Sequence, residues 1–85
     1  MKKVEIIPVA QRKAEKRGIK MVWIEDAVNS PTQIVKGYGG RKVAHKMVSI
    51  DDKEYLLRVV YEEDEEAFTV VTAYITSQID RYWSK

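Results

Sequence analysis

The sequence contains no cysteine, and its only histidine is His45. The lack of cysteine excludes disulfide bonds, thiol chemistry and zinc–thiolate sites. A lone histidine also excludes a histidine-based metal cluster, and with it most zinc hydrolase mechanisms. We therefore expect no metal site, and any catalysis must depend on lysine, arginine and tyrosine side chains.

Long apolar segments are missing as well. No run approaches the roughly 20 residues of a membrane span, and the N-terminus lacks the apolar region of a signal peptide. We therefore expect a cytoplasmic protein that does not contact membranes. With 85 residues, 45% of them hydrophobic and 33% charged, the chain is predicted to form one globular domain over residues 1–85.

Charge is almost balanced over the whole chain, at a formal net charge of +2, but it is segregated along the sequence. Residues 1–20 carry seven basic and two acidic side chains, and residues 36–50 carry four basic side chains and no acid. Residues 51–66 hold eight acids against two basic side chains. Basic surfaces of this kind attract phosphate groups, although charged runs are also common on solvated faces and turns.

Two helices are predicted in the N-terminal third. Residues 9–17 are rich in good helix formers, and Gly18 is placed to end that helix. Residues 20–29 carry an apolar stripe at helical spacing, and Pro31 marks the end of that helix. Residues 3–7 suit a short edge strand or an extended lead-in.

The rest of the sequence alternates between apolar and polar residues, which predicts strands. We expect four strands, at residues 32–36, 41–50, 54–61 and 67–75, joined by turns of hairpin length at 51–53 and 62–66. The tail, residues 76–85, is expected to add a short helical turn. The predicted fold class is therefore α+β, with two N-terminal helices on one face of a four-stranded, mainly antiparallel sheet.

The hairpins also predict which side chains share a face. If both turns are symmetric, Lys46 faces Arg58, Arg58 faces Val70, and Tyr61 faces Ala67. The face expected to pack on the helices then collects eight residues: Val43, Met47, Tyr55, Leu57, Val59, Val71, Ala73 and Ile75. A slip of one residue in either hairpin would exchange the two faces.

The opposite face is the candidate site, because it gathers Lys46, Arg58, Thr72 and Tyr74. Lysine and arginine bind phosphate oxygens and stabilise negative charge that develops during a reaction. Tyrosine donates hydrogen bonds, stacks on bases or transfers protons. The same side chains are also common as solvated or structural residues on strands, so spacing alone leaves both interpretations open.

Several other features favour structural roles. His45 falls on the helix-facing side in this register and is expected to be a partly buried residue with its hydrogen bonds satisfied. The glycines within residues 37–40 match no phosphate-binding motif and predict a tight turn. The acids at 62–66 lack calcium-binding spacing. Trp23 and Trp83 are expected to pack in the core or at its rim rather than to stack on bases.

Several motifs carry a resemblance to one family of sequences. They are Ala10-x-x-Lys13-x-x-x-Arg17-Gly18-Ile19, Val22-x-x-x-x-Ala27-Val28-x-x-Pro31, Gly40-Arg41, Leu57-Arg58-Val59-Val60-Tyr61, Val70-Val71-Thr72-Ala73-Tyr74, Thr76-Ser77 and Arg81-Tyr82-Trp83. Over most of its length the chain resembles a group of small prokaryotic domains of unknown function, which are similar to the RelE and BrnT toxins of toxin–antitoxin modules. The resemblance implies two helices packed on an antiparallel sheet, and a ribonuclease toxin that an antitoxin protein neutralises.

The resemblance also implies roles for individual residues. Metal-independent cleavage of RNA, with the 2′-hydroxyl as nucleophile, would need no cofactor. The catalytic residues would be Lys46, Arg58 and Tyr74. Arg41 and Thr72 would bind RNA or its phosphates. Beyond the resemblance, we expect Lys42, Lys13 and Arg17, which lie in the basic segments, to bind RNA as well.

Two features keep other interpretations open. Val9 stands where the family usually has a histidine, which favours a non-catalytic, toxin-derived module that binds RNA or a protein partner. In this register the candidate site face also carries four apolar residues: Val48, Val60, Phe68 and Val70. An antitoxin segment would cover them, and a homodimer would explain the same feature.

Overall fold

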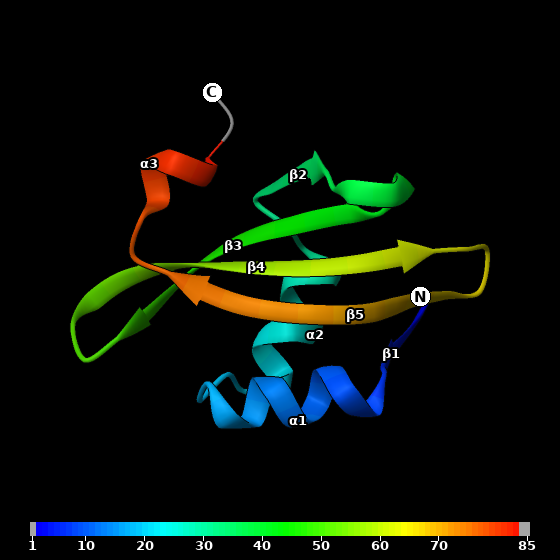
Figure 1. Cartoon of the computed structure of the whole chain (residues 1–85), viewed down its shortest axis with the longest axis horizontal. Coiled ribbons are helices and arrows are strands. Elements are labelled where there is room, and N and C mark those ends of the chain that lie inside the picture. Colours follow the sequence, from blue (N-terminus) through cyan, green and yellow to red (C-terminus); the bar gives the residue numbers. More distant parts are fainter. Residues whose placement is uncertain (1, 84–85) are drawn as a thin grey trace.

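The computed structural model of this protein describes residues 2–83 (Figure 1). Its elements in chain order are β1 (Lys3–Ile6), α1 (Pro8–Lys16), α2 (Met21–Asn29), β2 (Gln33–Lys36), the 3₁₀ turn η1 (Tyr38–Gly40), β3 (Lys42–Ile50), β4 (Lys53–Glu63), β5 (Ala67–Thr76) and α3 (Ile79–Tyr82). The predicted helical turn in the tail is α3, while positions 84–85 of that prediction lie outside the described residues. No helix within residues 2–83 has the length and apolar character needed to cross a bilayer.

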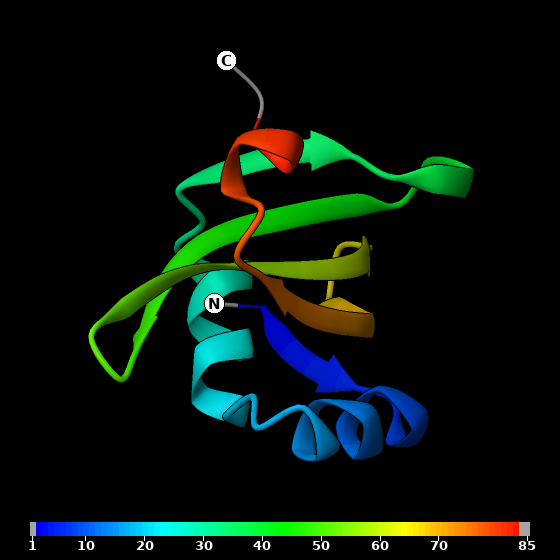
Figure 2. The ribbon, with the colours of Figure 1, turned by 60° about the vertical axis from the view of Figure 1, so that its left-hand side comes forward.

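The strands form one five-stranded sheet in the order β1-β5-β4-β3-β2. β1 pairs with β5 in parallel, and the other neighbouring strands are antiparallel. The prediction of four strands is therefore incomplete, because β1 adds a fifth strand and makes the sheet mixed. Helices α1 and α2 lie on one side of the sheet and α3 lies on the other (Figure 2).

Local sequence explains both ends of α1. Pro8 occupies the first turn, where the N–H group that proline lacks has no partner within the helix. At the other end Gly18 has a φ of +73°, a conformation that glycine adopts without strain. The N–H groups of Gly18 and Ile19 donate to the carbonyls of Glu15 and Ala14, at 3.1 and 2.9 Å. This glycine motif ends the helix where the sequence predicts and buries Ile19 against α2 and the sheet.

The β3–β4 hairpin decides which side chains of β3 face the helices. Its turn consists of Asp51 and Asp52, whose φ values of +51° and +65° are typical of a two-residue hairpin turn. The predicted three-residue turn is wrong by one residue, and this shifts the register of β3. Arg58 pairs with His45, whereas Lys46 points to the helix side and contacts the end of α2. The predicted grouping of Lys46 with Arg58 is therefore wrong.

Replacing Asp51-Asp52 by Asn-Gly is expected to stabilise the domain by about 0.5–1 kcal/mol, because both turn positions have positive φ and Asn-Gly fits them best. The midpoint of urea unfolding measures this effect. Glycine at Lys53, which lies in extended β4, is the control and is expected to lower the midpoint. An unchanged or lowered midpoint for the Asn-Gly variant would contradict the turn geometry.

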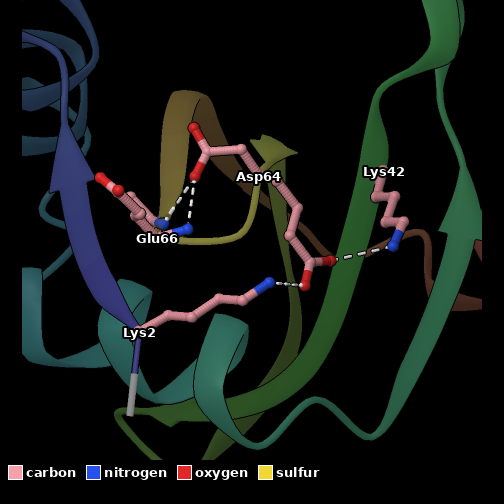
Figure 3. A network of polar contacts seen from close by, with 6 residues as sticks. Lys2, Lys42, Asp64 and Glu66 are labelled. Carbon is pink, nitrogen blue, oxygen red and sulfur yellow. Dashed lines mark hydrogen bonds and ion pairs between the residues drawn. The ribbon is translucent and has the colours of Figure 1, made fainter.

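The β4–β5 hairpin has a shorter loop than predicted. Oδ1 of Asp64 accepts hydrogen bonds from the N–H groups of Glu66 and Ala67, each at 2.8 Å, and these close the turn (Figure 3). The same two bonds, the one from Glu66 first, lower the pKa of Asp64 below its ordinary value. The predicted pairs Tyr61–Ala67 and Arg58–Val70 are wrong, because Tyr61 pairs with Val70 and Arg58 pairs with Tyr74.

A bulge in β5 determines which of its residues lie beside Arg58. Val71 is an extra residue between the pairs that β4 and β5 form on either side of it. Because of this residue, Val70 faces the helices while Thr72 and Tyr74 face the other way, with Arg58. The prediction that Arg58, Thr72 and Tyr74 share a face is confirmed.

The main core lies between the sheet and the two N-terminal helices. From β4 and β5 it includes Leu57, Val59 and Ala73, as predicted, but β3 contributes Ala44 instead of Val43 or Met47. Three of the apolar residues predicted on the site face belong to this core or pack against it: Val48, Phe68 and Val70. Of that group only Val60 lies on the site face. The same change of register places Val43 and Met47 of β3 on this face.

Candidate functional site

Four polar side chains form a row across β2, β3, β4 and β5, on the face that lies opposite α1 and α2. They are Gln33, His45, Arg58 and Tyr74, and each is the direct cross-strand partner of the next. Nδ1 of His45 lies 2.9 Å from Oε1 of Gln33, and Nε of Arg58 donates to Nε2 of His45 at 3.0 Å. Nη1 of Arg58 donates to the hydroxyl oxygen of Tyr74. We call these residues the polar row.

His45 is a buried, neutral member of this row, with a relative exposure of 0%. Because Nε of Arg58 only donates, Nε2 of His45 accepts, and Nδ1 carries the proton that is given to Gln33. Burial, and secondly the positive charge of Arg58, lower the pKa of His45 below its ordinary value of 6.5. His45 is therefore neutral, and its Nε2 atom, which carries no proton, accepts the hydrogen bond from Arg58.

Stability is expected to fall as the pH drops below about 6.5, because the pKa of His45 is lower in the folded protein than in the unfolded chain. The unfolded chain then binds a proton first. The contribution of His45 is fully present above about pH 6.5 and is lost between that pH and its folded pKa. Urea midpoints from pH 7.5 to 5.0 measure this loss, and His45→Gln is expected to remove it. If the urea midpoints of the wild type and of His45→Gln depend on pH in the same way, His45 is not the group whose protonation destabilises the fold.

Arg58 carries a positive charge that no carboxylate of the described residues neutralises. None of the ion pairs among residues 2–83 includes Arg58, although its side chain is half-buried. The rings of Tyr82 and Tyr74 lie 4.3 and 5.4 Å from its Cζ atom, and His45 and Tyr74 accept its hydrogen bonds. Neutral groups thus orient a guanidinium that is suited to bind an anion such as phosphate.

Lys46 lies on the other side of the sheet and contacts the C-terminal end of α2. Its Nζ atom donates to the carbonyl oxygen of Ser30 at 2.6 Å and lies 3.3 Å from Oδ2 of Asp26. A positive charge at this position complements the unpaired carbonyls that end a helix. These contacts account for Lys46 as a structural residue, and the structure does not bring it to Arg58.

Arg41 and Lys42 form exposed ion pairs with acids at the end of β4. Nε of Arg41 lies 3.1 Å from Oε2 of Glu62, and Nζ of Lys42 donates to Oε1 of Glu63 at 2.9 Å. Lys2 binds the other oxygen of Glu63, so that one carboxylate bridges two lysines (Figure 3). The hydrogen bond from Lys2, followed by that from Lys42, lowers the pKa of Glu63. The acidic and basic segments of the sequence therefore partly neutralise each other here.

The remaining predicted residues divide between the two sides of the sheet. Thr72 lies on the same face as Arg58, across from Val60. Arg17 donates from Nη1 to the carbonyl oxygen of Ala73 at 2.8 Å, and so satisfies a backbone group on the part of β5 that β1 does not cover. Lys13 is exposed on α1. Of the predicted site residues, the structure therefore gathers Arg58, Tyr74 and Thr72.

Sequence reasoning missed His45 and Gln33 as members of the site. It predicts His45 as a buried residue with satisfied hydrogen bonds, which is confirmed, but on the wrong side of the sheet. The signal that would have found it is the Asp51-Asp52 pair, because aspartate tolerates the positive φ of a two-residue turn. Trp83 is half-buried and stacks on His45, so its predicted packing role is confirmed on a face where no core was expected.

The fold and the polar row define the class of this protein as a small α+β domain, with two helices on one face of a mixed five-stranded sheet and a short helix on the other. Residues 8–75 match the model of a family described as "Domain of unknown function (DUF4258)", and the chain belongs to this family. The matched range contains the whole polar row and ends before α3. No curated protein and no solved structure matched the chain.

Proposed function

We propose that this domain binds RNA and cleaves it without a metal ion, with Arg58 at the phosphate group. One observation carries the proposal: a half-buried arginine, which has no carboxylate partner among residues 2–83, stands between a neutral histidine and a tyrosine on one sheet face. Arginine binds two oxygens of a phosphate group at once. Histidine and tyrosine transfer protons as general acids and bases.

In this proposal the 2′-hydroxyl of the RNA attacks the adjacent phosphorus. Nε2 of His45 takes the hydroxyl proton after Nε of Arg58 has turned to the phosphate, so His45 replaces Lys46 as the base. A bond forms between the 2′-oxygen and phosphorus while the bond from phosphorus to the 5′-oxygen breaks. The 5′-oxygen takes the proton of Tyr74, and Arg58 stabilises the charge on the non-bridging oxygens. The products are a 2′,3′-cyclic phosphate and a free 5′-hydroxyl.

Further parts of the proposal come from the resemblance to RelE and BrnT toxins. The two helices and the antiparallel strands β2–β5 support it, because the resemblance implies two helices packed on an antiparallel sheet. We propose that the domain acts as a toxin in the cytoplasm and that an antitoxin protein is its partner. Thr72 and Arg41 would contact neighbouring phosphates. Lys13 on α1 and Arg17 at the C-terminal end of that helix would contact a separate part of the RNA.

A second function is favoured by the aromatic residues over the polar row. The rings of Tyr82 and Trp83 lie against Arg58 and His45, so RNA reaches these side chains only if the rings move. Val9 also stands where the family usually has a histidine. Both observations suit a module that binds RNA or a protein without cutting a bond.

Incubation of the full chain with total RNA in the presence of EDTA, and separately with translating ribosomes in Mg²⁺-containing buffer, tests the proposal. We expect fragments with 2′,3′-cyclic phosphate and 5′-hydroxyl ends, and growth arrest when the chain is expressed in a bacterium. Intact RNA in every reaction, without growth arrest, would rule out cleavage. Retention of that intact RNA in a filter-binding assay would then support the second function.

A further inference from the structure

The C-terminal segment, residues 79–83, covers the middle of the polar row. Tyr82, the last residue of α3, places its ring 4.3 Å from Cζ of Arg58. The ring of Trp83 stacks on that of His45, with the centroids 5.9 Å apart and the planes inclined by 27°. Figure 2 shows α3 as the helix on this side of the sheet, connected to β5 by a short segment without regular structure. Two aromatic rings therefore lie over the two side chains that the proposed function assigns to phosphate binding and proton transfer.

Few contacts among the described residues attach this segment to the sheet. α3 has four residues, far fewer than the roughly 12–15 that an isolated helix needs to be stable in water. Within residues 76–83, the hydrogen bonds of the segment are local: Gln78 N–H to Thr76, Arg81 to Gln78, and Trp83 N–H to Ile79. Its N-cap residue, Gln78, makes no capping hydrogen bond. In the part of the chain that the structure describes, α3 is thus held on the polar row by the ring contacts of Tyr82 and Trp83 with Arg58, Tyr74 and His45.

The positions of these rings match those that nucleobases take on proteins. Single-stranded RNA is bound by stacking its bases on aromatic rings and on arginine guanidinium planes, with the phosphates bound by positive charge. Histidine is among the rings on which bases stack. A base on Arg58 or on His45 would occupy the space of Tyr82 or Trp83, so ligand and segment exclude each other.

We propose that residues 79–83 occupy the sites of two nucleobases and that single-stranded RNA displaces them from Arg58 and His45. This inference rests on the proposed RNA-binding function and adds the substrate class and the movement that binding requires. Exposed Ser77 and Gln78 connect β5 to α3 and are the hinge. The segment lowers the apparent affinity for RNA, because only the fraction of molecules with α3 displaced is able to bind.

A single-tryptophan reporter tests the displacement. Trp23→Phe leaves Trp83 as the only tryptophan of the chain. A fluorescein-labelled oligouridine with 2′-O-methyl groups cannot be cleaved by 2′-hydroxyl attack, and its anisotropy reports binding alone. We expect the emission of Trp83 to shift to longer wavelength at the same RNA concentration at which anisotropy rises. RNA that binds without changing the Trp83 emission would overturn the proposal.

The double variant Tyr82→Ala/Trp83→Ala tests the competition in the opposite direction. We expect it to bind the same oligouridine about 10-fold tighter than the wild type, because the covering rings are removed. Tyr38→Ala is the matched control, since Tyr38 is 95% exposed in the β2–β3 connection, and its affinity is expected to equal that of the wild type. Circular dichroism and thermal unfolding check that each variant is folded.

The remaining outcomes separate the two proposals. Weaker binding by the double variant would overturn the inference, because the rings would then be a stacking platform for RNA rather than its competitor. If the double variant binds RNA and the wild type does not, the inference is supported, because residues 79–83 then block the site completely in the wild type. If no variant binds RNA, the proposed function fails together with the inference. In that case, binding of a protein to the same face would support the non-catalytic module.

Discussion

Arg58→Gln is expected to reduce the rate of RNA cleavage by about 10²–10³-fold, the usual effect of removing one preorganised donor that stabilises charge in a transition state. The change removes both the positive charge and the two donors that Arg58 directs at His45 and Tyr74. Initial rates on a fluorescent RNA substrate measure the effect. The loss is expected in the maximal rate more than in the Michaelis constant, because the charge on the phosphate oxygens increases only in the transition state.

Two further variants distinguish the guanidinium from its charge. Lys53→Gln removes one positive charge from the exposed start of β4 and is expected to leave the rate within about twofold of the wild type, like most surface substitutions. Arg58→Lys keeps the charge but not the planar fork and is expected to recover only part of the rate. If Arg58→Gln cleaves RNA as fast as Lys53→Gln, the phosphate-binding role of Arg58 is excluded.

Leu57→Ala is expected to destabilise the fold by about 2–5 kcal/mol, which for a domain of this size lowers the melting temperature by roughly 10–30 °C. Leu57 is 0% exposed and belongs to the core cluster that joins the sheet to α1 and α2. Its truncation removes buried apolar surface and leaves a cavity between rigid elements. Thermal unfolding followed by circular dichroism measures the change.

Val22→Ala is the matched control for this substitution. Val22 lies on α2 but is 64% exposed, so its truncation is expected to change stability by less than about 0.5 kcal/mol. Equal melting temperatures for Leu57→Ala and Val22→Ala would mean that Leu57 does not face the helices. The register of the β3–β4 hairpin would then be wrong as well, because Leu57 and Lys46 are cross-strand partners.

Local patterns in the sequence predicted both N-terminal helices and the strands β2–β5. Gly18 and Pro31 mark the helix ends because their backbone preferences act within a few residues of chain. Strand positions follow from alternation, which also reflects only neighbouring residues. The pairing of β1 with β5 joins segments at opposite ends of the chain, and no local pattern specifies such a contact.

The register of the strands depends on details that local patterns describe poorly. A difference of one residue in the turn at Asp51-Asp52 places His45, instead of Lys46, beside Arg58. The extra residue Val71 in the middle of β5 then reverses which face of the sheet the following side chains of this strand point to. Each change is a matter of one residue, yet it moves every following side chain to the other face, because side chains alternate along a strand.

The amino-acid composition limits the chemistry that this protein can perform. Without cysteine, and with one histidine, it has the basic and hydroxyl side chains of β3, β4 and β5 as its predicted site. Which of these side chains meet depends on how the strands pair in the folded protein. The tertiary structure joined Gln33, His45, Arg58 and Tyr74 in one row and placed α3 over them. The physical reason is that composition is a property of the chain, whereas a site depends on cross-strand pairing, which turns and bulges set between distant residues.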